Sequence, residues 1–298
     1  MSTLEGAGLL IVDKAAGMTS HDVVARCRKL LHTKKIGHAG TLDPMATGVL
    51  VLGVDRATKM LGLLALTTKS YSATIRLGAA TTTDDAEGEV VSTVSALHIT
   101  DEDIAEHVAA LTGDISQVPS SVSAIKIDGR RAHALIRAGE EVVIPPRQVV
   151  VSKFHVLARR DEADGFVDLD VEVDCSSGTY IRALARDLGA ALGVGGHLTA
   201  LRRTVVGPFT LEHARTLEEL ADEPAVSLDI DTAALTAFPH RTIDADEAES
   251  LSQGRWLEPI GLAGVYATVD SEGRAIALVQ EKGKRAASVM VVRPATLR

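Results

Sequence analysis

One carboxylate stands out in the stretch GHAGTLDPMATGVLVLGV, residues 37–54, because it lies alone between a leucine and a proline. This residue is Asp43, and an apolar run follows it. The proline at position 44 disfavours the α-helical region for the residue before it, so Asp43 is expected in an extended loop. A carboxylate presented in a loop could act as a nucleophile or as a base, although most Asp-Pro pairs are turns or helix caps.

Glycines and small polar residues surround this aspartate. Gly37, Gly40 and Gly48 allow tight backbone and the close approach of a ligand, because glycine has no side chain. His38 and Thr41 add polar groups nearby. The stretch lacks the Lys-Ser/Thr pair of a phosphate-binding loop, so it does not indicate a nucleotide site.

The composition is typical of a globular protein with an aliphatic core, since 46% of the 298 residues are hydrophobic and only 3% are aromatic. No stretch approaches the roughly 18 apolar residues of a membrane span, and the N-terminus lacks the pattern of a secretory signal. We therefore expect a cytoplasmic protein without membrane contact, whose Cys27 and Cys175 are reduced thiols. The ten histidines are scattered without the spacing of a zinc site.

The net charge of −9 argues at first against a nucleic-acid partner, but the charges are segregated. Residues 1–80 carry ten Lys and Arg against five acids, whereas residues 81–118 carry nine acids and neither Lys nor Arg. Residues 251–298 are basic again, with a net charge of +3. Basic segments on one face would permit RNA binding, but the same pattern is also typical of ordinary surface variation.

The hydrophobic pattern predicts an α+β fold. Strand-like runs at 9–14, 48–54, 71–78 and 166–176 are interspersed with helical patterns, without a regular βαβ repeat. Thr19 and Asp22 have the spacing of a capping box before a helix. Further helices are expected over residues 57–66, 101–113 and 180–192. Because several strands alternate apolar and polar residues, a mainly antiparallel, mixed sheet with packed helices is favoured.

The C-terminal part reads as a separate small module. An acidic stretch over residues 211–250 precedes three strand-like runs, GVYATVD, RAIALVQ and ASVMVVRP. We predict two domains, at residues 1–238 and 239–298, the second being a β module too small to hold much stability alone.

Five collinear motifs resemble those of the TruB family of tRNA pseudouridine synthases. GHAGTLDPMATGVLVLG is similar to the catalytic-loop motif of that family, in which G-T-L-D-P holds the single essential aspartate. The other four, between residues 9 and about 208, are LLIVDKAAGMTSHDVV, KSYSATIRLGAATTTDDAEGEV, CSSGTYIRALARDLGAALG and GGHLTALRRT. The resemblance implies the pseudouridine synthase fold followed by a PUA-like C-terminal module.

The chain departs from the family pattern in two regions. Ala15 replaces the usual proline after Lys14. In VPSSVSAIKIDGRRAHAL, Ser120 stands for the second proline of the pattern, Val122 for a tyrosine, and His133 where a tyrosine is common. RNA contacts of the family in this second region therefore do not transfer directly.

The resemblance implies the isomerisation of uridine 55 in the TΨC loop of tRNA to pseudouridine. The base leaves through N1, rotates and rejoins the ribose through C5, so neither a cofactor nor a metal is required. The target uridine must be flipped out of its loop. Asp43 is the implied essential carboxylate, as a nucleophile toward the base or ribose or as a base on the sugar.

Further site residues follow from the same matched positions. Tyr71 is implied to lie against the flipped uracil and help move a proton from C5, and Arg182 to lie beside Asp43 and keep it ionised and aimed. His38 is implied to fill the gap left by the flipped base or to stack within the loop, and Leu201 to pack near the uracil. The remaining matched positions are expected to bind substrate or support the site: Lys14, Gly40, Thr41 and Tyr180.

Each of these residues also has a structural interpretation. Tyr71 and Leu201 could be plain core residues, His38 a loop histidine capping a backbone group, and Arg182 a surface helix residue that pairs with Asp187. Five basic side chains could contact phosphates or only solvent: Lys126, Arg130, Arg131, Arg202 and Arg203.

The expected partner is the T-arm stem-loop of tRNA, bound by a monomer without an obligate protein partner. One alternative is a tRNA-binding or tRNA-folding protein whose catalysis is secondary or lost. Another is the relative that works inside a guide-RNA ribonucleoprotein, although such members usually carry extra, often Lys-rich, extensions. A last alternative is a hydrolase that uses Asp43 with a second carboxylate such as Asp84 or Asp85.

Overall fold

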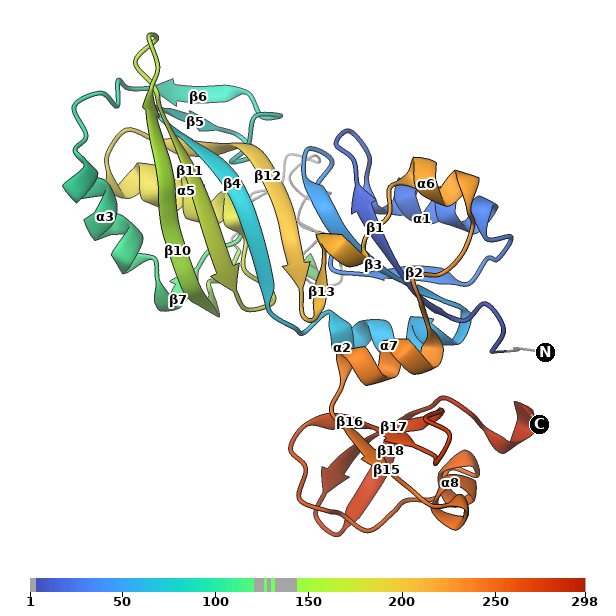
Figure 1. The fold of residues 1–298 in the computed structure, drawn as a ribbon. Coiled ribbons are helices and arrows are strands. Elements are labelled where there is room, and N and C mark those ends of the chain that lie inside the picture. Colours follow the sequence, from blue (N-terminus) through green and yellow to red (C-terminus); the bar gives the residue numbers. More distant parts are fainter. Residues whose placement is uncertain (1–3, 121–125, 128–129, 132–143, 298) are drawn as a thin grey trace. The chain divides into compact units, whose positions relative to one another are not determined.

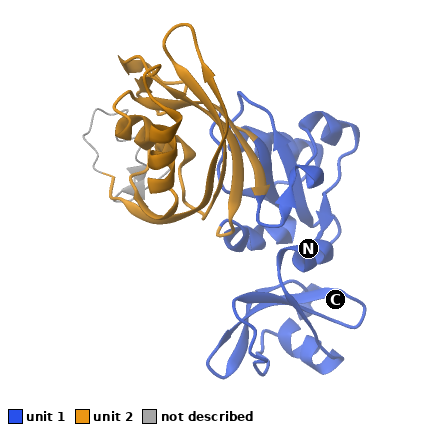
Figure 2. Ribbon diagram, turned by 60° about the vertical axis from the view of Figure 1, so that its left-hand side comes forward, with its two compact units in different colours: residues 1–44, 48–65, 206–298 blue, residues 45–47, 66–205 orange. Residues whose placement is uncertain are grey.

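The structure is a computed structural model that describes residues 4–120, 126–127, 130–131 and 144–297. The chain forms two compact units (Figure 2). Unit 1 comprises residues 1–44, 48–65 and 206–298, and unit 2 comprises residues 45–47 and 66–205. Unit 1 is therefore assembled from both ends of the chain, whereas unit 2 is almost continuous in sequence.

The N-terminal part of unit 1 is built on buried antiparallel strands. β1 (Gly8–Lys14) pairs on one side with β14 (Leu228–Asp229) and on the other with β3 (Thr47–Val54), which also pairs with β2 (Ile36–Ala39). β1 and β3 are almost wholly buried, as their uninterrupted apolar sequences predict. The helical segments of this part are α1 (Ser20–Leu30), η1 (Asp55–Met60), α2 (Leu61–Leu64), η2 (Leu211–His213), α6 (Leu217–Asp222) and α7 (Ile230–Ala237).

The predicted capping box is present at the start of α1. The side chain of Thr19 accepts the backbone N–H of Asp22, and the carboxylate of Asp22 accepts the backbone N–H of Thr19. These reciprocal bonds satisfy two donors that a helix start leaves unpaired. They also fix where the next residue, Ser20, enters the helix.

The C-terminal part of unit 1 is a four-stranded sheet in the order β15-β16-β17-β18 (Figure 1). The three predicted strands are present as β16 (Val265–Val269), β17 (Ala275–Lys282) and β18 (Arg285–Val291). β15 (His240–Thr242), parallel to β16, and α8 (Ala245–Ser252) were not predicted, because both are too short for a clear period. A 3₁₀ turn, η3 (Ala295–Leu297), follows the sheet.

One apolar core joins both parts of unit 1. It contains Leu9, Ile11 and Val51 from the first strands together with Leu278 and Met290 from the C-terminal sheet. A second cluster, around Tyr266 and Leu251, lies within the C-terminal part. The predicted domain division after residue 238 remains a prediction about independent folding.

Unit 2 is built on a five-stranded run of the sheet, β12-β4-β11-β10-β7. The bounds are β4 (Lys69–Leu77), β7 (Gly113–Gln117), β10 (Arg147–Asp161), β11 (Val167–Cys175) and β12 (Gly196–Val206). α3 (Asp101–Ala110) packs against β10, and α5 (Ile181–Ala191) packs against β4. Two small hairpins complete the described elements: β5 (Ala79–Thr81) with β6 (Val90–Thr93), and β8 (Lys126–Ile127) with β9 (Arg130–Arg131). β13 (Phe209–Thr210) follows β12 in the chain and belongs to unit 1.

The α+β fold is confirmed, and three local predictions need correction. Residues 57–66 form the end of η1 followed by the single turn of α2. The helix over α3 ends at Ala110 instead of reaching Gly113, which adopts a φ of +94° and begins β7. The alternation over residues 168–174 predicts an acidic face that is only solvated, but on β11 the acids of this face form ion pairs.

These ion pairs run across neighbouring strands. Asp168, only 6% exposed, accepts two hydrogen bonds from Arg76 of β4, each 2.8 Å long. Asp170 pairs with Arg160 and Glu172 with Lys153, both on β10. Period-two alternation predicted which residues face outward, but it could not predict that cations of two other strands lie opposite them.

Candidate active site

The residues before Asp43 are fixed by a buried hydroxyl. Ser20, in the first turn of α1, donates from Oγ to the carbonyl of Leu42 at 3.1 Å and accepts the N–H of Leu42 at 2.9 Å. Ser20 is 1% exposed and Leu42 is 3% exposed, so both bonds are shielded from water. The Ser20 hydroxyl thus satisfies the backbone N–H and carbonyl of Leu42, which have no partner in a helix or strand.

The residues after Asp43 are fixed by a buried ammonium group. Nζ of Lys14 donates to three carbonyls, those of Met18 at 2.7 Å, Ala15 at 2.9 Å and Pro44 at 3.1 Å. The backbone N–H of Gly17 also donates to the carbonyl of Pro44, at 2.8 Å. Lys14 is fully buried, so its donors are directed at a cage of carbonyls.

We call residues 40–44 the Asp43 loop. Asp43 itself is half-buried and lies outside any helix or strand, as the following proline predicts. Gly40 has a φ of +77° and Gly48 a φ of +100°, so these two positions require glycine. Thr41 is exposed at the start of the loop.

His38 lies on β2, immediately before the loop. Its ring meets that of His21, from the first turn of α1, edge to face with the centroids 5.4 Å apart. The start of α1 therefore contributes both Ser20, which holds Leu42, and His21, which contacts His38. In unit 1 the structure brings Lys14, His38 and the Asp43 loop around one helix start.

Arg182 lies in the first turn of α5 in unit 2 and is 4% exposed. Its Nη1 donates to the carbonyl of Thr83 at 2.8 Å and forms an ion pair with Asp85 Oδ2 at 3.3 Å. Asp85 also accepts the hydroxyl of Thr83 and the backbone N–H of Glu87. We call Arg182, Asp85 and Thr83 the Arg182 network. The alternative prediction, that Arg182 is a surface helix residue paired with Asp187, is wrong, because Arg182 is buried and pairs with Asp85.

A more exposed pair lies next to this network. Asp84, with a φ of +60°, pairs with Arg186 at 3.3 Å, and Arg186 also contacts Asp187. Burial is the main cause that raises the pKa of Asp187 above its usual value. Because Asp84 and Asp85 are each paired with an arginine, neither resembles the free second carboxylate that a hydrolase would require.

Tyr71 and Leu201 are both buried in unit 2, at 8% exposure each. Tyr71 lies on β4 opposite Val173 of β11, on the face that also carries Ala73, Ile75 and Leu77. Leu201 lies on β12, the strand that pairs with the other edge of β4. Alternating apolar and polar residues over 71–78 predict that Tyr71 lies on this buried face, and the structure confirms it. The role of Tyr71 in the reaction stays a prediction.

Tyr180 is the residue that precedes α5, and its backbone is held by one side chain. Gln117, 2% exposed at the end of β7, accepts the N–H of Tyr180 at 2.8 Å and donates to its carbonyl at 3.1 Å. This pair of bonds connects the end of β7 to the helix that carries Arg182. Sequence patterns gave no signal for Gln117, because it lies 63 residues from its partner.

Lys69 and Arg203 form a buried basic pair, and this juxtaposition was not predicted, although Arg203 was a candidate phosphate contact. Lys69 is 7% exposed and Arg203 is 1% exposed. Burial, together with the neighbouring charge of Arg203, lowers the pKa of Lys69 to about 8. Burial also raises the pKa of the Cys175 thiol to about 11, so this cysteine is an un-ionised buried thiol at neutral pH. The matched motif that begins with Lys69-Ser70-Tyr71 was the sequence signal that could have identified Lys69 as a site residue.

The five basic side chains that were predicted as possible phosphate contacts differ in burial. Arg202 is half-buried and donates to the hydroxyl of Thr47 at 3.3 Å, whereas Arg203 is too buried to reach a phosphate at the surface. The β8–β9 hairpin carries Lys126, Arg130 and Arg131, whose side chains the structure does not describe. Val122 and His133 lie outside the described residues. Ser120, which replaces a proline of the family pattern, is fully buried.

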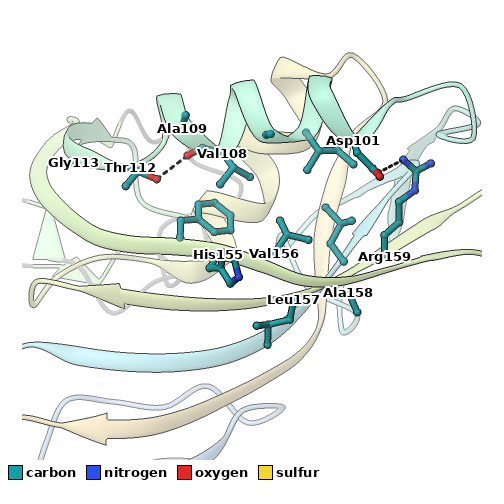
Figure 3. A pocket seen from close by; sticks show the side chains of 14 residues that line it. Asp101, Val108, Ala109, Thr112, Gly113, His155, Val156, Leu157, Ala158 and Arg159 are labelled. Carbon is teal, nitrogen blue, oxygen red and sulfur yellow. Dashed lines mark hydrogen bonds and ion pairs between the residues drawn. The ribbon is translucent and has the colours of Figure 1, made fainter.

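A groove of about 820 Å³ lies between α3 and β10 (Figure 3). Its walls are mainly apolar, and an ion pair between Asp101 and Arg159, 2.8 Å long, lies along it. None of the predicted site residues lines this groove. Across the part of the chain that the structure describes, no cluster of three His, Cys, Asp or Glu side chains is suited to hold a metal ion, and no helix is long and apolar enough to span a membrane.

Comparison with known families accounts for nearly the whole chain. Residues 28–181 match the model of the TruB family pseudouridylate synthase N-terminal domain. Residues 182–238 match the tRNA pseudouridylate synthase B C-terminal domain, and residues 238–293 match the tRNA pseudouridine synthase II C-terminal model.

Individual relatives agree with the family models. The chain is 77% identical to tRNA pseudouridine synthase B of Rhodococcus jostii (strain RHA1), over 100% of this chain and 97% of the relative. It is 74% identical to the protein of the same name from Nocardia farcinica (strain IFM 10152), over 96% of this chain and 94% of the relative.

Among solved structures, the chain is similar to one described as "Crystal Structure of a Cbf5-Nop10-Gar1 Complex". The two share 26% identity and a TM-score of 0.73, over 99% of this chain and 87% of the other. A second similar structure contains an H/ACA RNP bound to a substrate RNA, with a TM-score of 0.72 and 24% identity over 98% and 86% of the two chains; this likeness concerns the fold. Full-length identity to the curated relatives, the three family models and the shared fold agree, and the chain belongs to the TruB family of tRNA pseudouridine synthases.

Proposed function

We propose that this member of the family converts uridine 55 in the T arm of tRNA to pseudouridine, with Asp43 as the essential carboxylate. The reaction breaks the bond between C1′ of the ribose and N1 of uracil. The base turns and C1′ bonds to C5. C5 loses its proton to solvent and N1 takes up a proton, so the product is an isomer of the substrate. Asp43 acts either as a nucleophile toward the base or the ribose, or as a base on the sugar.

The main support for this proposal is the way in which the Asp43 loop is held. Both neighbours of Asp43 are fixed through their main chain, Leu42 by Ser20 and Pro44 by Lys14 and Gly17. A carboxylate between two such fixed points loses little freedom when substrate binds. Preorganisation of this kind is what nucleophilic or basic catalysis requires.

We propose that Tyr71 and Arg182 act on the same uridine as Asp43, as the family resemblance implies. Arg182 would keep the carboxylate ionised, and Tyr71 would stack against the flipped base and assist loss of the C5 proton. His38, Leu201, Lys14, Gly40, Thr41 and Tyr180 would contact substrate or support the site. The protein would act in the cytoplasm, as a monomer without an obligate partner, and flip the target uridine from its loop.

The first test is tritium release from [5-³H]uridine in a T-arm stem-loop, because the reaction replaces the hydrogen on C5. Wild type should release tritium and Asp43→Asn should not, while the variant still binds tRNA within about tenfold of wild type, because phosphate contacts are separate from the chemistry. Asp114→Asn, which removes an exposed carboxylate on β7, is the matched control and should be fully active.

Three outcomes would contradict the proposal. Equal release by wild type and Asp43→Asn would remove Asp43 from the chemistry. No release from either protein, in samples that bind the stem-loop, would favour a tRNA-binding protein without catalysis. Release from a stem-loop in which only uridines other than position 55 carry the label would show that the target is wrong.

A further inference from the structure

The groove between α3 and β10 lies in unit 2 and runs along the edge of a strand. Six consecutive residues of β10, Phe154–Arg159, line it. Side chains of successive strand residues point to opposite faces of a sheet, so a cavity that touches all six lies along the backbone edge of the strand. Figure 3 shows α3 extending along this part of β10.

This edge of β10 has no neighbouring strand among the residues that the structure describes. β10 spans Arg147–Asp161, but β7 pairs only with residues 147–151, and β11 occupies the other edge. Beyond residue 151, alternate residues of β10 therefore direct a backbone N–H and C=O toward the groove. A β-bulge lies at Leu157, where the register with β11 shifts, so the regular part of the free edge is residues 153–156. Such unpaired polar groups are a template for one further short strand.

The floor of the groove is apolar, and the wall that α3 contributes is low. Ile104, Val108 and Phe154 are buried and form part of the floor. Ala105 and Ala109 also line the groove but are exposed, so they leave room that larger side chains would fill. An extended peptide that pairs with β10 would bury every second side chain on this floor.

The groove is open before anything binds, because α3 is held at both ends. At the start of the helix, Arg159 donates to Oδ1 of Asp101 at 2.8 Å and to the carbonyl of Ile99 at 2.9 Å. At the end of the helix, the chain passes through Gly113 into β7, which pairs with β10. The helix cannot move onto the strand without breaking these contacts. A preformed site loses little free energy to ordering when it binds a ligand.

The rim of the groove is acidic. Glu102 and Glu106 are exposed, and each stands three residues before one of the groove alanines, on the neighbouring ridge of α3. Residues 81–118 contain nine acids and neither Lys nor Arg. Three cations of β10 near the groove are each paired with an acid: Lys153 with Glu172, Arg159 with Asp101 and Arg160 with Asp170. The rim therefore repels phosphates and favours a basic partner.

We propose that this groove binds an extended segment of another protein, which adds to the free edge of β10 as a short strand. The segment carries apolar side chains at alternate positions, for the floor, and Lys or Arg at the others, for the acidic rim. Backbone pairing supplies affinity, and the alternate apolar contacts supply specificity. RNA is disfavoured as the occupant, because its phosphates would meet Glu102 and Glu106.

A fluorescein-labelled peptide of alternating lysine and valine is the probe, and its anisotropy reports binding. Wild type should bind it saturably, and should bind a peptide of alternating glutamate and valine at least about tenfold more weakly. Ala109→Trp fills the groove and should weaken binding of the basic peptide at least about tenfold. Ala110→Trp makes the same change at the adjacent exposed alanine, which does not line the groove, and should bind as wild type. Thermal unfolding of both variants near the wild-type temperature would show that they are folded.

Two further measurements separate backbone pairing from charge. An edge strand bonds through the N–H groups of alternate residues only, so N-methylation of one alternate set in the peptide should abolish binding and methylation of the other set should not. Amide exchange in the complex should slow at residues 153–156 and not at Val90–Thr93, an exposed strand elsewhere in unit 2. Glu102→Gln/Glu106→Gln should weaken binding of the basic peptide about fivefold at low salt, as loss of two exposed ion pairs does.

The proposal is overturned if the basic peptide does not bind saturably, if Ala109→Trp and Ala110→Trp bind it equally, or if neither methylated peptide loses affinity. It is also overturned if the T-arm stem-loop displaces the peptide, because the groove would then belong to an RNA site. None of these measurements uses tritium release, so their outcome is independent of the function proposed for Asp43.

Discussion

The Asp43 loop and the Arg182 network are both rigid, but different forces hold them. The loop is fixed through its main chain by a buried hydroxyl and by a buried ammonium group surrounded by carbonyls. In the network, the guanidinium is fixed through its side chain by a buried carboxylate. Loss of the neutral hydrogen bonds from Ser20 should therefore lower the unfolding free energy only slightly. Loss of Asp85, the counter-charge of Arg182, should lower it much more.

The largest effect is expected for Asp85→Asn. The ion pair with Arg182 is almost fully buried, and removal of one partner leaves an uncompensated charge, at a cost of about 4 kcal/mol in the free energy of unfolding. Urea denaturation would measure this loss, with Asp84→Asn as the comparison, since its arginine is more exposed and the loss should be below about 1 kcal/mol. Equal losses in the two variants would contradict the assignment of Asp85 as the counter-charge.

A somewhat smaller effect is expected from Lys69, and it depends on pH. The folded pKa of about 8 lies below the ordinary value of 10.5, so between pH 8 and 10.5 the unfolded chain binds more protons and the unfolding free energy rises with pH. The penalty is fully present below pH 8 and amounts to roughly 3 kcal/mol at most. Lys69→Met should be more stable than wild type at pH 7, and the difference should shrink toward pH 10.

A pH-independent difference between wild type and Lys69→Met would show that packing, not charge, causes the change. Lys153→Met is the control, because Lys153 is exposed. The difference in unfolding free energy between this variant and wild type should not shrink between pH 7 and pH 10.

Lys14→Met should destabilise the protein by about 2 kcal/mol, because three buried carbonyls lose a charged donor while the cost of burying that charge is also removed. The kcat for tritium release should fall more than the KM rises, since the Asp43 loop moves while RNA contacts remain. Thermal unfolding and steady-state kinetics would measure both effects. A change in KM alone would indicate that Lys14 contacts RNA directly.

The smallest effect is expected for Ser20→Ala, about 1 kcal/mol in unfolding free energy, as for a typical buried neutral hydrogen bond. The kcat should fall only a few-fold. Ser20→Thr keeps the hydroxyl, so its unfolding free energy and its kcat should both lie between those of Ser20→Ala and wild type. A loss as large as that of Asp85→Asn would contradict the distinction between the two supports.

Sequence reasoning succeeded where the information is local. The capping box at Thr19, the alternation of β4 and the position of Asp43 outside any helix or strand each depend on residues within a few positions of one another. Collinear motifs supplied the family and the candidate site residues.

The supports of the site could not be predicted in this way. Ser20 lies 22 residues from Leu42, and Arg182 lies 99 residues from Thr83, so no periodicity connects them. Asp85 was considered only as a hydrolytic carboxylate, although its T-x-x-D motif was the available signal. The acids of β11 were misread for the same reason, because their cations lie on other strands.

Assembly of unit 1 from both ends of the chain has a consequence for synthesis on the ribosome. Leu9 and Ile11 share a core with Leu278 and Met290, so the first strands emerge long before their last partners exist. At translation rates of about 5–20 residues per second, these apolar strands wait for tens of seconds. Unit 2, nearly continuous in sequence, can fold during that interval. The nascent chain should therefore acquire protease resistance in its middle before its beginning, in contrast to the N-terminal-first order of most multidomain proteins.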